Sequence, residues 1–294
     1  MFEIFVQGSL PDVDALHAKL AHVFPDVKKF PLPDVESRAT AGIVFYEREA
    51  RLDETLARTL QIMEAVEKGL GTKAGFDIQV RDLARSEPPG WSEGFKEPFE
   101  PVPGLVIRPW DSFSGRAPDE NTILLDPKHS FGTGKHPSTR LCLEVLAQLA
   151  SDSRLDSRDV LDVGCGTGIL AVAAVKMGAS RALGVDIDPE CVRAARKNAL
   201  HNNLSQAIEI RQGSLDAVQG KYGLVLANLV ASVLISVGPK IPGCLKDGGL
   251  AVVSGFGENQ SAEMRRLFEG CGLGIEREFT LDGWSAFLMT RERE

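Results

Sequence analysis

The chain has 294 residues, which exceeds an average domain and predicts one large domain together with a smaller one. Its composition, 43% hydrophobic and 25% charged, is typical of a globular protein with a hydrophobic core. A formal net charge of −8 argues against direct binding of nucleic acid, which requires a basic surface, and suits a cationic partner such as a lysine-rich protein.

The five cysteines are scattered and never spaced as C-x-x-C. They therefore predict neither a disulfide framework nor a zinc site, and they favour a reducing cytoplasm. The sequence has no recognisable signal peptide and no apolar run of about 18 residues that would span a membrane. Because nothing in the pattern suggests a subunit interface, we expect a cytoplasmic monomer without a bound metal.

Residues 1–84 are expected to form a small α+β domain. Apolar alternation and helical spacing predict, in chain order, a strand at 2–6, a helix at 13–24, a strand at 42–46, a helix at 52–70 and a strand at 76–80. A further strand near 27–30 would give a ferredoxin-like arrangement.

Residues 85–118 are expected to form a proline-rich linker. Seven prolines lie between Pro88 and Pro118, which predicts an extended connector outside the packed core. Aromatic residues in this stretch suggest that parts of it dock on a surface; they are Trp91, Phe95, Phe99 and Trp110.

Residues 119–294 are expected to form an α/β domain, in which apolar strands alternate with helical patterns. The predicted strands are 160–163, 182–185, 208–211, 224–227 and 250–254, and the predicted helices are 169–177, 189–201 and 229–245. This alternation predicts a Rossmann-like, doubly wound and mostly parallel sheet.

A glycine-rich turn, Asp162-Val163-Gly164-Cys165-Gly166-Thr167-Gly168, joins the first of these strands to its helix. Glycines let the backbone approach a ligand, and the helix N-terminus offers free N–H groups. The spacing is not the G-x-G-x-x-G of dinucleotide-binding enzymes, because Ile169 stands five residues after Gly164. Asp162 suits the ammonium group of S-adenosylmethionine, directly or through water, and disfavours a pyrophosphate. A plain turn without a ligand is the alternative.

Acidic and polar residues follow the next strands. Asp186 ends the second strand, where a carboxylate can accept hydrogen bonds from both ribose hydroxyls of an adenosine. Asp188 precedes Pro189 and is predicted to cap the next helix. Ser214 follows the third strand, where the edge of an adenine ring would lie, although an ordinary loop explains it nearly as well.

Asn228 ends the fourth strand. Its amide oxygen could accept a hydrogen bond from an amine and direct the nitrogen lone pair at a methyl carbon, and positioning supplies most of the catalysis in such a transfer. The alternative is a helix N-cap. Upstream, the polar loop 126–139 is not a phosphate-binding loop, because His136 follows Lys135 where Ser or Thr is required. His136 is either a base or a structural histidine.

The glycine-rich turn, Asp186 and the strand order resemble class I S-adenosylmethionine-dependent methyltransferases. The loop 126–139 is similar to the signature DPGxAFGTGxHPTT of one family, the bacterial ribosomal protein L11 methyltransferases (PrmA-type). The segments 185–189 and 227–229 match that family's DIDP and ANI/L motifs. The resemblance covers residues 86–294 by motif and the N-terminal part by architecture and length only.

This resemblance implies methyl transfer to lysine side chains and a terminal α-amine of the large-subunit ribosomal protein L11. It implies that Thr139, Gly164, Asp186 and Asn228 contact the cofactor, and that Thr133 lines the methyl-transfer pocket. Trp284 and Phe131, with Asn228, would exclude water and align the amine. Lys128 and His129 depart from the family's small residues, and Phe95 stands where a Trp is common.

Three other functions stay open. A methyltransferase acting on another protein or a small amine would keep the same cofactor site. A glutamine or nucleic-acid amino methyltransferase usually carries Asn-Pro-Pro-Tyr, whereas Leu229 and Val230 follow Asn228 here. A cofactor-binding sensor without enzymatic activity would not need Asn228 or the glycine loop 131–134.

Overall fold

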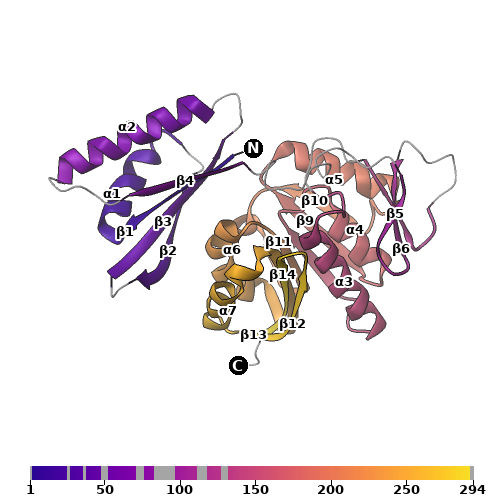
Figure 1. The fold of residues 1–294 in the computed structure, drawn as a ribbon. Coiled ribbons are helices and arrows are strands. Elements are labelled where there is room, and N and C mark those ends of the chain that lie inside the picture. Colours follow the sequence, from indigo (N-terminus) through magenta and orange to yellow (C-terminus); the bar gives the residue numbers. More distant parts are fainter. Residues whose placement is uncertain are drawn as a thin grey trace. The chain divides into compact units, whose positions relative to one another are not determined.

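The computed structural model describes residues 2–24, 27–35, 38–47, 52–70, 76–82, 97–110, 118–126 and 132–291. The chain divides into two compact units, Met1–Pro89 and Gly90–Glu294, and each is described by itself (Figure 1). Within the described residues, every helix is too short or too polar to cross a lipid bilayer.

The N-terminal unit is a four-stranded sheet with two helices. Its elements are β1 (Phe2–Ser9), α1 (Leu10–Leu20), β2 (Lys28–Val35), β3 (Arg38–Glu47), α2 (Leu52–Leu70) and β4 (Asp77–Asp82). The strand order is β2-β3-β1-β4, and every neighbouring pair is antiparallel. Ile4 and Val6 share one face of β1, since side chains alternate along a strand, and they pack with α1 and α2 in one core.

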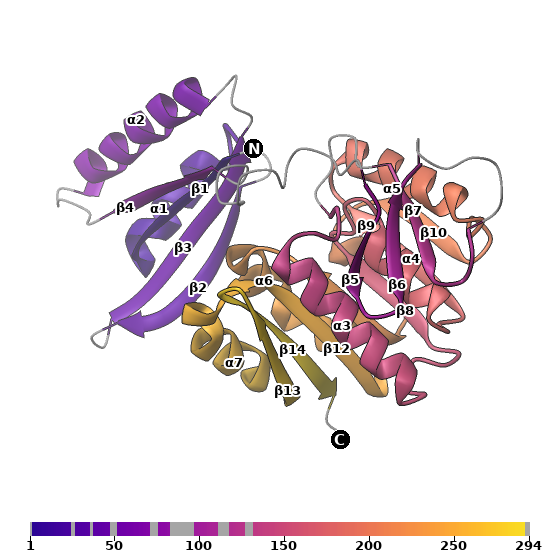
Figure 2. The ribbon, with the colours of Figure 1, turned by 45° about the vertical axis from the view of Figure 1, so that its right-hand side comes forward.

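The C-terminal unit begins with a small three-stranded sheet, whose strands lie side by side in Figure 2. Strand β5 (Phe99–Val102) pairs antiparallel with β6 (Leu105–Pro109), and β6 pairs parallel with β7 (Thr122–Leu125). The expectation that the whole of 85–118 is a linker outside the core is wrong for β5 and β6, because Val102, Leu105 and Ile107 are buried in the core. The prolines are tolerated because β5 is an edge strand and Pro109 ends β6.

The main sheet has seven strands in the order β10-β9-β8-β11-β12-β14-β13. Its strands are β8 (Asp159–Val163), β9 (Arg181–Asp186), β10 (Ile208–Gln212), β11 (Tyr222–Asn228), β12 (Leu245–Gly257), β13 (Leu273–Leu281) and β14 (Trp284–Arg291). The five predicted strands are present and parallel. The hairpin β13–β14 was not predicted, and its strands are antiparallel to each other and to β12.

Helices cover both faces of this sheet (Figures 1 and 2). Along β8, Val160 packs in the core that includes α3 (Pro137–Ser151), α4 (Ile169–Lys176) and α5 (Pro189–His201), whereas Leu161 packs with α6 (Ala231–Val237) and α7 (Ser261–Gly270). The predicted helix 229–245 is shorter: α6 gives way to a 3-10 helix, Gly238–Cys244, because Pro239 and Pro242 cannot continue an α-helix. Two more 3-10 turns follow β10 and β12, at Leu215–Ala217 and Glu258–Gln260.

Candidate active site

The predicted site residues gather at the carboxyl ends of the parallel strands. The glycine-rich turn follows β8, Asp186 ends β9 and Asn228 ends β11. Strand order reverses between β8 and β11, because β9 and β10 lie on one side of β8 while β11 and β12 lie on the other. In open α/β sheets a ligand binds in the crevice at such a switch point.

The turn is built for close approach of the backbone. Gly164, Gly166 and Gly168 have φ values of 68°, 53° and 78°, in the left-handed region that favours glycine. Two of these glycines are also closely packed, because a Cβ on Gly164 would lie 2.3 Å from Leu229 Cδ2 and one on Gly168 would lie 3.0 Å from Ala195 Cβ. The free N–H groups at the start of α4 follow directly.

Asp186 connects the turn to the end of β9. Its carboxylate accepts hydrogen bonds from the Gly166 N–H at 2.9 Å and the Asp188 N–H at 3.0 Å. Burial raises the pKa of Asp186, and these two hydrogen bonds act in the opposite direction. The carboxylate is therefore held in one orientation, at the place where we expect the ribose of the cofactor.

The residues around Asp186 have separate roles. Asp188 accepts a hydrogen bond from the Glu190 N–H at 2.8 Å, so the predicted cap of α5 is confirmed. Ile187 was not singled out by the sequence analysis; it is an apolar residue next to Asp186 in the chain and is 65% exposed. Ser214 precedes a 3-10 turn in a surface loop, and its hydroxyl donates to Asp216 at 3.4 Å.

Asp162 lies beneath the turn and is 1% exposed. Its carboxylate accepts a hydrogen bond from the Ala171 N–H of α4 at 3.2 Å. This burial leaves almost no surface for direct contact with a ligand, so the structure supports a role in holding the start of α4, and contact with an ammonium group stays a prediction. Burial, assisted by the charge of Asp186, raises the pKa of Asp162 to about 7.

Asp162→Asn is expected to change how stability depends on pH. The folded-state pKa of Asp162 is raised from 3.8 to about 7, so the folded protein retains a proton that the unfolded chain releases. Protonated Asp162 contributes no more than about 4 kcal/mol to the free energy of unfolding. This contribution is fully present below the pKa of the unfolded chain and is lost as pH rises to about 7. The variant lacks this loss, so its free energy of unfolding should rise relative to that of the unmodified protein between pH 4 and 8. Urea denaturation across this range tests the difference, and parallel curves would contradict it.

Asn228 and Thr139 meet across the carboxyl edge. The Asn228 Nδ2 group donates to Thr139 Oγ1 at 3.1 Å. Asn228 Oδ1 is buried and has no hydrogen-bond partner among the described residues. The cap of α6 is Val230, without a side-chain bond, so the alternative of Asn228 as a helix N-cap is wrong.

The loop before α3 contributes Thr133 and His136. His136 is 5% exposed, and its Nδ1 bonds both the hydroxyl of Ser138, at 2.7 Å, and the backbone N–H of Ser138 as the cap of α3. The structure thus favours the structural histidine over the base. Trp284, at the start of β14, meets the His136 ring edge-to-face with centroids 4.5 Å apart. Thr133, three residues before His136 in the chain, is half-buried.

Several predicted residues lie outside the described residues. They are Trp91 and Phe95 of the expected linker, and Lys128, His129 and Phe131 of the loop. The role of Phe131 in the acceptor pocket therefore stays a prediction.

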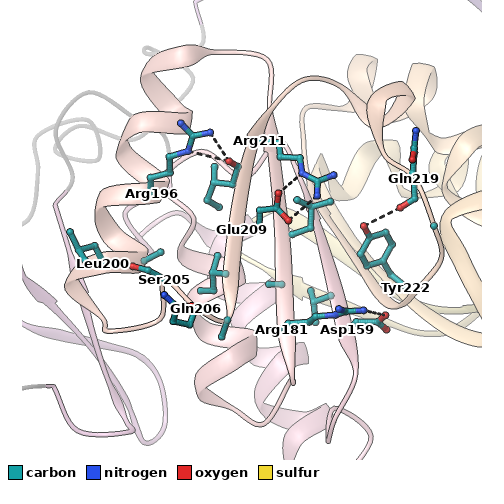
Figure 3. Close-up of a pocket in the computed structure, with 18 of the residues that line it drawn as sticks. Asp159, Arg181, Arg196, Leu200, Ser205, Gln206, Glu209, Arg211, Gln219 and Tyr222 are labelled. Atoms are coloured by element: carbon teal, nitrogen blue, oxygen red, sulfur yellow. Dashed lines mark hydrogen bonds and ion pairs between the residues drawn. The ribbon is translucent and has the colours of Figure 1, made fainter.

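A separate groove, of about 830 Å³, lies along β10 and at the amino ends of β8 and β9 (Figure 3). Within the groove, Arg181 pairs with Asp159, Arg211 pairs with Glu209, and Arg196 donates to the Ile210 carbonyl. None of the predicted site residues lines this groove, so it plays no part in the arrangement described above.

Comparison with known proteins identifies the family. The sequence model of the ribosomal protein L11 methyltransferase (PrmA) family matches residues 19–292. The L11 methyltransferase of Geobacter metallireducens is 35% identical over 249 residues, 83% of this chain and 79% of the relative. That of Syntrophotalea carbinolica is 34% identical over 278 residues, 88% and 89% of the two chains.

A solved structure agrees. The ribosomal protein L11 methylase of Lactobacillus delbrueckii subsp. bulgaricus superposes with a TM-score of 0.59 at 28% identity, covering 67% of this chain and 100% of that chain. The fold is thus the α/β fold of methyltransferases with a mixed seven-stranded sheet. The chain belongs to the ribosomal protein L11 methyltransferase (PrmA) family, whose members are S-adenosylmethionine-dependent enzymes.

Proposed function

We propose that this protein transfers methyl groups from S-adenosylmethionine to lysine side-chain amines and the N-terminal α-amine of ribosomal protein L11. Family membership supports the substrate. The observation that carries the chemistry is Asn228 Oδ1, a buried acceptor without a partner among the described residues. A buried carbonyl oxygen is normally hydrogen-bonded, so one left open at a strand end is poised for a donor that arrives with the substrate.

The cofactor would lie across the switch point. The residues that would hold it are the glycines of the turn, Gly164, Gly166 and Gly168, together with Asp186, Thr139, Asn228 and Ser214. S-adenosylmethionine, when bound, supplies a methyl group on a sulfonium. An amine nitrogen would bond to that methyl carbon, and the electron pair of the carbon–sulfur bond would stay on sulfur. Ile187 offers an exposed apolar surface next to Asp186.

The protein's task is to present a neutral amine. Free lysine has a pKa near 10.4, and a water-excluding pocket lowers it because desolvation disfavours the charged form. Asn228 Oδ1 accepts one amine N–H and thereby points the lone pair at the methyl carbon. Thr133, Phe131 and Trp284 enclose the amine, and the proton leaves to water. His136 is not required as a base, because its Nδ1 already serves as the cap of α3.

The finer organisation is part of the proposal. The order β2-β3-β1-β4 supports a ferredoxin-like N-terminal domain, residues 1–84, that recognises the protein substrate. Helices on both faces of the main sheet support a Rossmann-like, doubly wound catalytic domain at 119–294. The connecting linker within 85–118 would end before β5. We expect a monomer in the cytoplasm that does not bind nucleic acid.

Mass spectrometry tests the proposal. Ribosomal proteins from cells that lack this enzyme are incubated with purified protein and isotopically labelled S-adenosylmethionine, with heat-denatured protein as the control. Label on lysines or the N-terminus of L11 is the expected result. If the protein binds the cofactor but labels no ribosomal protein, the substrate assignment is wrong, and another protein or a small amine takes its place. A protein that binds the cofactor without any turnover would be a sensor.

A further inference from the structure

Thr167 lies between Gly166 and Gly168 in the glycine-rich turn, and its side chain bonds the loop before α3. Its side chain is fully buried, and its hydroxyl donates to the Gly132 carbonyl at 2.6 Å. Gly132 immediately precedes Thr133, one of the proposed acceptor-pocket residues. One side chain of the glycine-rich turn thus bonds the backbone of the loop that contains Thr133, 35 residues earlier in the chain.

Two glycines flank Thr133 where the loop packs closely against its neighbours. A Cβ on Gly132 would lie 2.9 Å from Thr167 Oγ1, and one on Gly134 would lie 2.3 Å from Ile107 Cδ1. Both glycines have positive φ, 102° and 85°. The backbone on either side of Thr133 therefore packs against the start of α4 and against β6. The position of Thr133 thus depends on these neighbouring elements as well as on the loop itself.

A second set of bonds holds the other end of the loop to the same residue. Asn198 of α5, fully buried, donates from Nδ2 to the Thr167 carbonyl at 2.9 Å and accepts from the Asp126 N–H at 2.8 Å. Asn202, one helical turn later, bonds both the N–H and the carbonyl of Leu124 in β7. Thr167, in the glycine-rich turn, is thus linked directly to Gly132 and, through Asn198, to Asp126.

We propose that Thr167 is a positioning residue of the acceptor site: its hydroxyl sets the distance between the methyl donor and the acceptor pocket. The inference rests on the proposed function, because it is the acceptor pocket that Thr167 positions. Gly166 and Gly168 keep their own conformations when the hydroxyl is lost, so cofactor binding and acceptor alignment are separable. A misplacement of the acceptor by about 1 Å costs a large factor in rate without weakening cofactor binding.

Thr167→Val and Thr167→Ser separate the hydroxyl from the shape of the side chain. Valine has nearly the same shape but cannot donate, whereas serine can. We expect Thr167→Val to lower kcat for L11 methylation about 10-fold or more, with the KM for S-adenosylmethionine little changed, and Thr167→Ser to restore most of the rate. Hydrogen–deuterium exchange should show faster exchange in residues 132–136 of Thr167→Val, a readout that needs no activity.

Thr59→Val is the matched control. Thr59 in α2 is also fully buried and donates from its hydroxyl to a backbone carbonyl, that of Thr55, at 2.7 Å. Its loss should leave kcat and the exchange of residues 132–136 unchanged. The inference is overturned if Thr167→Val keeps the full rate, if its defect lies in the KM for the cofactor with unchanged exchange, or if serine fails to restore the rate. Absence of L11 methylation by the unmodified protein would instead refute the proposed function, and the exchange comparison would still decide the role of Thr167.

Discussion

Asn228→Ala is expected to lower kcat for methyl transfer roughly 100-fold or more, while cofactor binding remains measurable. The variant loses the buried Oδ1 acceptor that we propose binds the amine, and it loses the Nδ2 donor that bonds Thr139. The glycine-rich turn and Asp186 are untouched. Steady-state kinetics with L11, together with calorimetric titration of S-adenosylmethionine, measure the two effects separately.

Ser285→Ala is a matched control for this prediction. Ser285 Oγ is a second buried polar atom without a partner among the described residues, but it lies within β14 and has no role in the proposed chemistry. Its removal should leave kcat unchanged. Unchanged turnover of Asn228→Ala would refute the proposed role of the amide, and equal losses in both variants would point to a general packing defect.

Gly255→Ala is expected to destabilise the fold by about 3 to 5 kcal/mol, since positive-φ strain and overpacking each cost about 1–3 kcal/mol. Gly255 has φ 96°, and a Cβ there would lie 2.2 Å from the backbone oxygen of Leu229, the residue after Asn228. A backbone atom cannot move aside as a flexible side chain can. The hydrogen bond from the Leu229 N–H to the Ser254 carbonyl, 3.0 Å, would be strained too, and the neighbouring Asn228 would be displaced. Chemical denaturation and the kcat of the remaining folded protein test this expectation.

Gly248→Ala shows how much of that effect is backbone strain alone. Gly248 lies in the same strand, β12, with φ 68°, but a Cβ there has no atom within 4 Å. This variant should lose about 1–2 kcal/mol and keep its kcat. Equal destabilisation by the two substitutions would show that the contact with Leu229 is unimportant.

Much of the site could be predicted from the sequence because it depends on local chemistry. The strand–turn–helix around Gly164 is recognisable from short-range spacing, and Asp186 and Asn228 end apolar runs that the structure confirms as β9 and β11. Parallel strands place their carboxyl ends at one edge, so these residues meet wherever the strands pair in parallel. Asp188 as a helix cap follows from its own neighbours in the same way.

The parts that were wrong or missed depend on pairing between distant segments. The residues of β5 and β6 lie in a proline-rich stretch and become strands only by pairing with β7 and packing on α3 and α4. The hairpin β13–β14 was missed because β13 is irregular: its register shifts between Ile275 and Arg277, which breaks the alternation that identifies a strand.

By itself, the sequence determined the class of the site: a glycine turn, a carboxylate and an amide at three strand ends, in a pattern that resembles one family. Only the tertiary structure decided what each group does there. Thr139, 89 residues before Asn228, accepts a hydrogen bond from the Asn228 Nδ2 group, and Asn228 Oδ1 has no partner among the described residues. Asp162, by contrast, is buried beneath the turn. Hydrogen bonding and burial depend on what the fold brings within a few ångströms, and that information is not local in the chain.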